Sequence, residues 1–194
     1  DSLKYHSVQH IHYVSEAERR VYADRAEFMG DMDFVPVPIN ELSSDRYAQI
    51  RWSSVDSLTA TPSTDITHGE IPFGYKESEE TTHYSIVDQW GNAVSVTTTI
   101  NGLFGNGIVV DGAGFLLNNE MDDFSIKPGT PNSYGLIGNT ANAIEPGKRM
   151  LSSMSPTIVE NLEGELFLVI GSPGGSTIIT TTAQIIMNVI DFGM

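Results

Sequence analysis

The sequence contains no cysteine and few basic residues. Disulfides, thiolate catalysis and cysteine-ligated metal are therefore excluded, and the redox compartment stays undetermined. Ten Lys and Arg stand against 25 Asp and Glu, which gives a formal net charge of −15, and seven of the ten precede residue 81. Because no basic patch alternates with aromatic residues, nucleic acids and anionic membranes are poor candidate partners. The sequence also lacks a run of about 18 apolar residues, which would predict a membrane span.

The length and composition of the chain predict a folded domain. Its 194 residues can bury a core, and 40% hydrophobic with 18% charged residues is typical of a globular protein. The sequence starts at Asp1, close before a helical pattern, and stops just after a long apolar one. No signal peptide is visible. We therefore expect the sequence to be a fragment of a longer protein.

Apolar periodicity predicts a helix over residues 6–29, with Gly30 as its C-cap. The apolar stripe of this helix comprises Val8, Ile11, Val14, Ala17 and Val21. A shorter helix is expected over 41–53. The acidic pair Asp31 and Asp33 is assigned to a surface turn. Residues 55–80, mostly Ser, Thr, Pro, Asp and Glu, have the composition of a linker.

Beyond residue 80 the pattern changes to strands. Two hairpins are predicted, one with strands at 83–87 and 93–99, the other with strands at 156–159 and 166–170. Residues 127–149, rich in Pro, Gly and Asn, are expected to form a surface loop with little structure of its own. A helix over 176–191 is predicted from the length of its apolar pattern, although Thr and Ile are weak helix formers.

The boundary between linker and strands carries the most informative feature, the sequence Thr-Thr-His at 81–83. It directly follows the acidic run at 77–80. Cleavage before Thr81 would give an N-terminal threonine that carries both a hydroxyl nucleophile and an α-amine as its base. An α-amine titrates near pH ~7.7–8.0, so much of it can be neutral at physiological pH. The structural alternative is two β-branched residues that open a strand.

A glycine pair, Gly174 and Gly175, lies between a predicted strand and a predicted helix. Such a turn can bind an anion through backbone N–H groups and the positive end of the helix dipole. A phosphate-binding loop is excluded because no Gly-Lys-Ser/Thr follows and no lysine lies after Arg149. The functional interpretation that remains is an oxyanion hole, and the structural one is an ordinary tight turn.

Two further segments suit the opposite charges of a zwitterion. Residues 118–123, Asn-Asn-Glu-Met-Asp-Asp, offer three acids and two amides that could bind an ammonium group. A calcium loop is the less favoured interpretation, because the ligand spacing of an EF-hand and its closing Glu are missing. Ser152 and Ser153 offer hydroxyls to a carboxylate. A solvated loop and a polar strand entry are the respective structural alternatives. The five histidines lack metal-ligand spacing, and we expect neither a metal nor a cofactor.

Together these segments resemble the γ-glutamyltranspeptidases, a family of the N-terminal-nucleophile hydrolase class. The resemblance includes Tyr-Ala-Asp-Arg at 22–25 and Thr-Thr-His-Tyr-Ser at 81–85. It continues through the segments at 117–125, 151–157 and 171–176, in the family's order. Several long motifs in one order are far more specific than any one of them.

The resemblance implies a catalytic role for four residues. Thr81 would be the nucleophile of both self-cleavage and catalysis. The Thr99 hydroxyl would hydrogen-bond to Thr81 and orient it. Gly174 and Gly175 would supply the N–H groups of the oxyanion hole.

The resemblance also implies a binding site for the head group of a glutamyl substrate. Its α-ammonium would be held by Asn101, Glu120 and Asp123, and its α-carboxylate in part by Ser152 and Ser153. The family has Gln or Glu at the position of Glu120. Tyr134 lies in a loop that resembles the lid of the bacterial members, where it would reach Asn101 and gate the pocket.

The implied fold is α+β, the four-layer αββα sandwich of N-terminal-nucleophile hydrolases. Residues 1–80 would end the large subunit and residues 81–194 would begin the small, catalytic one. The parent protein would transfer or hydrolyse a γ-glutamyl group, as in glutathione, with an amino acid, a peptide or water as acceptor. It would need the rest of both subunits, including an arginine outside this chain that binds the α-carboxylate. A periplasmic or secreted location is expected from the family.

Two alternative functions stay open. The first is an acylase for cephalosporin-like substrates, against which the 118–123 segment argues because a glutaryl side chain has no α-amine. The second is an inactive homologue that only binds amino acids or partner chains. The second would leave the Glu80–Thr81 bond intact.

Overall fold

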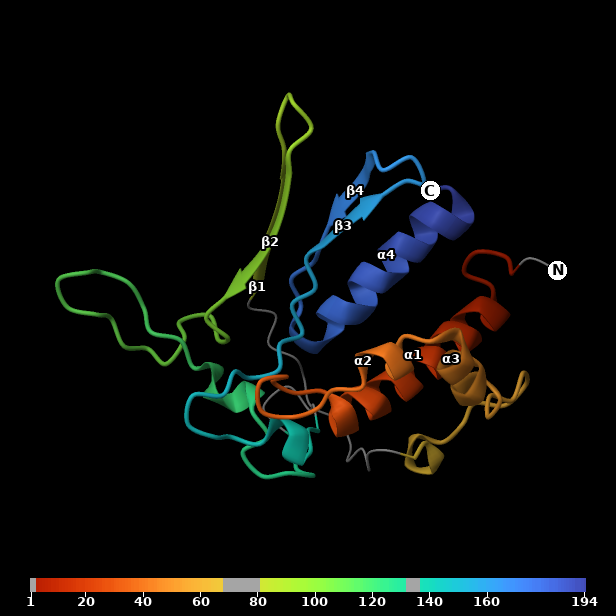
Figure 1. Cartoon of the computed structure of the whole chain (residues 1–194), viewed down its shortest axis with the longest axis horizontal. Helices are drawn as coiled ribbons and strands as arrows, with labels where there is room; N and C mark the ends of the chain where they lie inside the picture. Colours follow the sequence, from red (N-terminus) through yellow and green to blue (C-terminus); the bar gives the residue numbers. More distant parts are fainter. Residues whose placement is uncertain (1–2, 68–80, 132–136) are drawn as a thin grey trace. The chain divides into compact units, whose positions relative to one another are not determined.

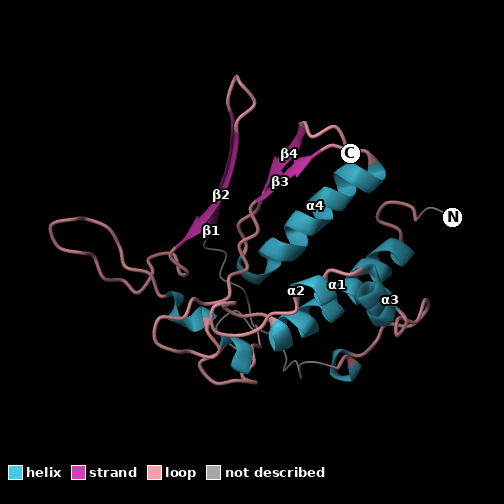
Figure 2. Ribbon diagram, in the orientation of Figure 1, coloured by secondary structure: helices cyan, strands magenta, loops and turns pink. Residues whose placement is uncertain are grey.

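The computed structural model describes residues 3–67, 81–131 and 137–194, and its helices and small antiparallel sheets are of the α+β class (Figures 1 and 2). The chain forms two compact units. The first unit comprises Asp1–Gly74 and Asp123–Leu151, and the second comprises Tyr75–Asp122 and Ser152–Met194. The described residues of the first unit lie on both sides of the expected cleavage point, and the division into 1–80 and 81–194 stays a prediction.

The first helix, α1 (Val8–Phe28), has the bounds that the sequence predicts to within two residues. The Ser7 side chain caps its first turn by accepting a hydrogen bond from the His10 N–H. The C-cap is Met29, not Gly30 as predicted. Gly30 is instead a point of close approach, because a Cβ there would collide with the backbone carbonyl of Ala141.

The buried side of α1 is mostly polar, and much of the apolar stripe that predicted the helix is exposed. Val8 is 87% exposed, and Ile11 and Val21 are more than half exposed. Glu16 and Arg20, in contrast, are 1% and 3% exposed. Within the described chain, α1 therefore packs through charged side chains against the segment that follows α3.

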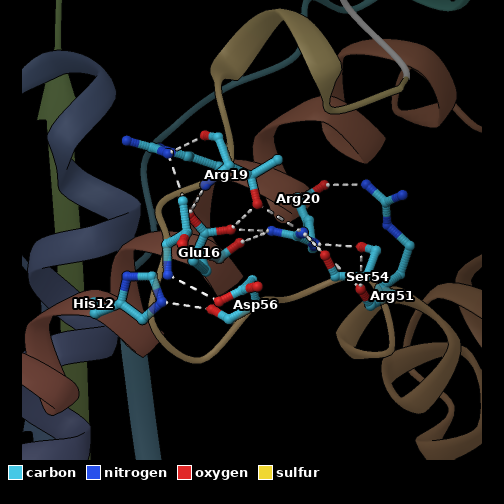
Figure 3. A network of polar contacts seen from close by, with 9 residues as sticks. His12, Glu16, Arg19, Arg20, Arg51, Ser54 and Asp56 are labelled. Carbon is cyan, nitrogen blue, oxygen red and sulfur yellow. Dashed lines mark hydrogen bonds and ion pairs between the residues drawn. The ribbon is translucent and has the colours of Figure 1, made fainter.

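Glu16 is the centre of this polar contact (Figure 3). Its carboxylate accepts hydrogen bonds from the Thr61 N–H at 2.9 Å, the Thr61 hydroxyl at 2.6 Å and Arg20 at 2.7 Å. Arg20 in turn donates to both the hydroxyl and the carbonyl oxygen of Ser54 at 3.0 Å. Burial alone would raise the pKa of Glu16, but the hydrogen bonds from Thr61 and Arg20 outweigh it and lower the pKa to about 2.

The predicted helix at 41–53 is two helices, α2 (Ile39–Leu42) and α3 (Asp45–Trp52). The break falls at two serines, and Ser44 begins α3 by accepting a hydrogen bond from the Tyr47 N–H at 3.1 Å. Serine favours a cap over a helix interior because its hydroxyl replaces a missing backbone partner. The segment predicted as a linker forms a 3-10 turn, η1 (Ser63–Asp65), before residue 67.

The turn predicted at Asp31 and Asp33 is present and Asp33 is exposed, but the prediction that Asp31 lies at the surface is wrong. Its side chain is 1% exposed, and the Arg149 side chain donates to both of its oxygens, at 2.6 and 3.0 Å. These hydrogen bonds from Arg149 hold the pKa of Asp31 well below its usual range. Residues 118 positions apart are thereby joined within the first unit.

The 127–149 segment was predicted to be a surface loop with little structure, and its described part is partly buried. It contains the 3-10 turn η3 (Thr140–Asn142), and Asn142 and Lys148 are 5% and 7% exposed. Ser125 and Ala143 form an isolated parallel bridge. The loop is therefore anchored in the first unit.

The second unit contains two antiparallel hairpins. The first is β1 (Thr81–Val87) with β2 (Ala93–Thr99), and the second is β3 (Thr157–Glu160) with β4 (Leu166–Ile170), as predicted. The hairpins contact one another, and the Ser95 hydroxyl donates to the Ile170 carbonyl at 2.9 Å. The last helix, α4 (Ile178–Phe192), ends at Gly193, whose φ of 67° is left-handed.

Among the described residues, no helix combines the length and the apolar character needed to cross a membrane.

Candidate active site

Thr81 is the first residue of β1 and pairs with Thr99, the last residue of β2. Both strands have seven residues, and the pairing runs without a bulge from Val87–Ala93 to Thr81–Thr99. Side chains of directly opposite residues lie on the same face of an antiparallel pair. The register therefore puts the two hydroxyl-bearing side chains next to each other. The Thr99 hydroxyl oxygen also accepts a hydrogen bond from the Asn101 N–H at 2.9 Å.

A tight turn fixes this register. The Asp88 carboxylate accepts hydrogen bonds from the N–H groups of Trp90 and Asn92, both at 2.9 Å. Gly91, with φ of 85°, supplies the left-handed residue that the turn requires. A one-residue slip would turn Thr81 to the opposite face from Thr99.

His83 connects β1 to the end of β4. Its Nδ1 is 2.8 Å from the Thr97 hydroxyl and its Nε2 is 3.0 Å from the Ser85 hydroxyl. The ring lies so close to Gly171 that a Cβ at this glycine would overlap it. The strand that begins at Thr81 is thereby packed against the segment that leads from β4 to the glycine pair.

Gly174 and Gly175 lie in the predicted strand–turn–helix arrangement, between β4 and α4. Their φ angles are 128° and 54°, which favour glycine. The N–H and the hydroxyl of Thr177 both donate to the Gly174 carbonyl, at 3.0 and 2.7 Å. The pair thus precedes the N-terminus of a 15-residue helix, where the helix dipole favours negative charge.

Asn101 and Glu120 lie in two loops that hydrogen bonds hold together. Asn101 is 7% exposed, has a left-handed φ of 71°, and donates from its side chain to the Asn119 carbonyl at 3.1 Å. The Asn119 side chain accepts from the Gly102 N–H at 2.8 Å. Glu120 begins the 3-10 turn η2 (Glu120–Asp123). Two of the three residues predicted to bind an ammonium group are therefore on adjoining segments.

Asp123 belongs to the first unit, whereas Thr81 belongs to the second. Its backbone carbonyl accepts a hydrogen bond from the Asn142 side chain at 2.7 Å. Its negative charge also acts on Arg25: burial lowers the pKa of Arg25, and the charges of Tyr22 and Asp123 partly offset this. The loop therefore holds the Asp123 backbone, and the charge of Asp123 influences a residue in the last turn of α1.

The structure places Ser152 and Ser153 just before β3, where both form hydrogen bonds with residues close by in the sequence. The Ser152 hydroxyl accepts from the Met154 N–H at 3.1 Å, and the Ser153 carbonyl accepts from the Ser155 hydroxyl at 3.1 Å. Ser152 is exposed and Ser153 is half-buried. Tyr134 lies outside the described residues.

Comparison with known proteins supplies the decisive observation: the family model of γ-glutamyltranspeptidase matches residues 1–194. The chain belongs to the γ-glutamyltranspeptidase family. It is 53% identical over 189 residues to the glutathione hydrolase proenzyme of Escherichia coli K12. The aligned region is 97% of this chain and 32% of that protein. The glutathione hydrolase proenzyme of Pseudomonas aeruginosa PAO1 is 50% identical over 190 residues, or 98% of this chain and 33% of its own length.

Solved γ-glutamyltranspeptidase structures also match. A threonine-to-alanine mutant of the Helicobacter pylori γ-glutamyltranspeptidase is 69% identical, with a TM-score of 0.56, over 58% of this chain and 60% of that chain. The present chain spans about a third of the length of the curated relatives it matches. It is therefore a part of the γ-glutamyltranspeptidase architecture.

Sequence reasoning missed one polar residue of this γ-glutamyltranspeptidase chain, Asn142, which bridges two segments of the site. Its neighbours in the sequence, Ala141 and Ala143, carry no chemistry that could have singled it out. In the part of the chain that the structure describes, no three histidine or acidic side chains come together as a metal site would require.

Proposed function

We propose that the protein containing this chain transfers or hydrolyses γ-glutamyl groups, as in glutathione and γ-glutamyl amides, through a γ-glutamyl ester on Thr81. One observation carries the proposal: the register of β1 and β2 sets Thr81 opposite Thr99 at the start of a strand. The family match over residues 1–194 supports the same chemistry.

Cleavage of the Glu80–Thr81 bond would free the α-amine of Thr81. The Thr81 hydroxyl attacks the γ-carbonyl and gives its proton to this amine. Gly174 and Gly175 supply N–H groups to the oxyanion, and the proton passes to the leaving amine as the amide bond breaks. Water, or the amine of an acceptor amino acid or peptide, then attacks the ester and releases Thr81.

The substrate head group is bound at both ends. Asn101, Glu120 and Asp123 accept from the α-ammonium, and Ser152 and Ser153 donate to the α-carboxylate, together with an arginine outside this chain. Tyr134 closes the pocket as a lid that reaches Asn101. The four-layer αββα sandwich, with residues 1–80 and 81–194 on either side of the cleavage, and a periplasmic or secreted location belong to the same proposal.

The comparisons do not favour the acylase alternative. The acidic segment at the start of η2 argues in the same direction, because Glu120 and Asp123 suit a substrate with an α-amine and a glutaryl group has none. An inactive binding protein remains the alternative of a different class. It predicts an uncleaved Glu80–Thr81 bond.

The test is maturation of the full-length protein. On denaturing gels the wild type should resolve into two bands, and Edman sequencing should give Thr81 as the new N-terminus. The Thr81→Ala variant should stay a single band and lack activity on a γ-glutamyl anilide. Cleavage of the variant at this bond would refute Thr81 as the nucleophile, and an intact wild type would favour the binding protein.

A further inference from the structure

Asn142 is a buried side chain that joins two separate segments of the chain. It lies at the end of η3 and is 5% exposed. Its Nδ2 donates to the Asp123 carbonyl at 2.7 Å, and its Oδ1 accepts from the Leu151 N–H at 3.0 Å. Its own carbonyl accepts from the Ser125 N–H at 2.9 Å. All of these contacts lie within the first unit, so they do not depend on how the two units are placed.

The two segments that Asn142 joins carry the opposite ends of the proposed head-group site. Asp123 is the residue proposed to meet the α-ammonium. Leu151 directly precedes Ser152 and Ser153, which are proposed to meet the α-carboxylate. One side chain thus holds the backbones of Asp123 and Leu151 within the first unit, with its donor toward Asp123 and its acceptor toward Leu151.

We propose that Asn142 is a positioning residue that fixes the backbone of Asp123 against the backbone of Leu151, and thereby the preference for acyl groups that carry an α-ammonium. This inference rests on the proposed function. Asparagine is suited to the task because a single planar amide offers a donor and an acceptor on opposite sides. A buried backbone carbonyl or N–H that loses its hydrogen-bond partner costs free energy of folding. The two hydrogen bonds of Asn142 therefore restrain both backbone segments.

The turn that carries Asn142 is itself fixed to α1. The Asn139 N–H donates to the Ala26 carbonyl at 3.0 Å, and the Asn139 side chain donates to Glu27 at 2.7 Å. Gly138 packs so closely on Ser125 that no Cβ fits there. The Asn139 N–H and the close packing of Gly138 hold this turn independently of the Asn139 side chain, so removal of that side chain alone leaves the turn supported.

Two substitutions separate the two ends of the bridge. Asn142→Asp keeps an acceptor for the Leu151 N–H, but the ionised carboxylate presents an oxygen to the Asp123 carbonyl where Nδ2 donated. Asn142→Ala removes both hydrogen bonds. Asn139→Ala is the matched control, because it cuts the link of the same turn to Glu27 and leaves the bridge intact.

The experiment measures kcat and KM of the full-length wild type and the three variants on a γ-glutamyl anilide and a glutaryl anilide, with the matured fraction normalised by gel. For Asn142→Asp we expect kcat/KM on the γ-glutamyl anilide to fall about 10-fold, mainly through KM, with a much smaller change on the glutaryl anilide. Asn142→Ala should lower both, and Asn139→Ala should leave the ratio of the two unchanged.

Equal losses on the two anilides in Asn142→Asp would overturn the inference. So would an Asn139→Ala variant that shifts the ratio as much as Asn142→Asp, because the turn would then act only as general support. A wild type without γ-glutamyl activity would instead overturn the proposed function and the inference with it. The wild-type measurement thus distinguishes the two failures.

Discussion

At the scale of the residue, the pairing of Thr81 with Thr99 gives a direct test of the proposed mechanism. Thr99→Val keeps the shape of the side chain and removes its hydroxyl. We expect turnover of a γ-glutamyl anilide to fall by about 10- to 1,000-fold, as for other groups that position a proton transfer. The measurement is kcat of the matured enzyme.

Thr98→Val is the matched control for this experiment. Thr98 is the neighbouring residue on β2, it is exposed, and it pairs with Thr82. Because side chains alternate along a strand, Thr98 points away from the face that Thr81 and Thr99 share. Its substitution should leave turnover nearly unchanged. Unchanged turnover in Thr99→Val itself would remove Thr99 from the mechanism.

A second residue-scale prediction concerns the charge of Asp123. Asp123→Ala would leave the α-ammonium without its charged partner, and a charge-assisted hydrogen bond is worth roughly 1.5–3 kcal/mol. The kcat/KM on a γ-glutamyl anilide should therefore fall by about 10- to 150-fold. Activity on a glutaryl anilide, which lacks the amine, should change little. Equal losses on both would show that Asp123 supports the fold or maturation.

The sequence predicted contacts between residues that lie close together along the chain. It did not predict the partners of residues whose contacts come from distant segments. The Thr81–Thr99 pairing follows from two strands of equal length around one turn, which is information within 19 consecutive residues. Asp31 depends on Arg149, and nothing near Asp31 in the sequence signals this partner. Asn142 has the same limitation, because its role comes from Asp123 and Leu151, which lie on either side of its loop.

At the scale of the element, α1 offers a prediction with a pH dependence. Glu16→Gln removes the carboxylate charge that Arg20 and Thr61 surround. The lowered pKa of Glu16 corresponds to a stabilisation of the folded state on the order of 3 kcal/mol at neutral pH. The melting temperature should therefore fall at neutral pH. Glu41→Gln, an exposed carboxylate in the same unit, should have little effect.

The difference between wild type and Glu16→Gln should shrink in acid. The pKa of Glu16 is lowered from 4.5 to about 2, so its contribution is complete above pH 4.5 and is lost as the pH falls toward 2. Melting curves of both proteins across this range provide the measurement. A difference that stays constant over the range would contradict the ionised Glu16–Arg20 pair as its source.

The apolar periodicity of α1 predicted the helix correctly, but it did not indicate which face of the helix is buried. Periodicity reports that one face is apolar, but which neighbour covers a face is a property of the tertiary structure. In this chain the described neighbours of the buried Arg20 and Glu16 include Thr61, Ser54 and Arg51, which offer hydroxyl and carbonyl oxygens, so the polar side of α1 packs against them. The hairpins were predicted better because their partners are adjacent in the sequence.

At the scale of the whole molecule, the first unit contains described residues from before and after Thr81, so we predict that cleavage before Thr81 does not separate the two pieces. The Asp31–Arg149 pair joins a residue before the cleavage point to one after it. The matured pieces should co-elute in size-exclusion chromatography and separate only in denaturant. Separation under native conditions would contradict this arrangement.

The strength of this association should depend on Asp31. Asp31→Asn should lower the urea concentration at which the pieces separate, because Arg149 loses a charged, bidentate partner. Asp33→Asn is the control, because Asp33 also meets Arg149, at 2.6 Å, but both side chains are exposed and such pairs contribute little. The pKa of Asp31 is lowered, so the effect should persist down to its ordinary value of 3.8 and fade below it.

The same pair has a consequence for synthesis on the ribosome. Asp31 is made 118 residues before Arg149. At translation rates of about 5–20 residues per second, this corresponds to a delay of about 6–24 s. During that time Asp31 has no Arg149 to pair with. The first unit therefore completes its contacts only after the strands at 81–87 and 93–99 have been synthesised, although its helices α1 to α3 precede those strands in the chain.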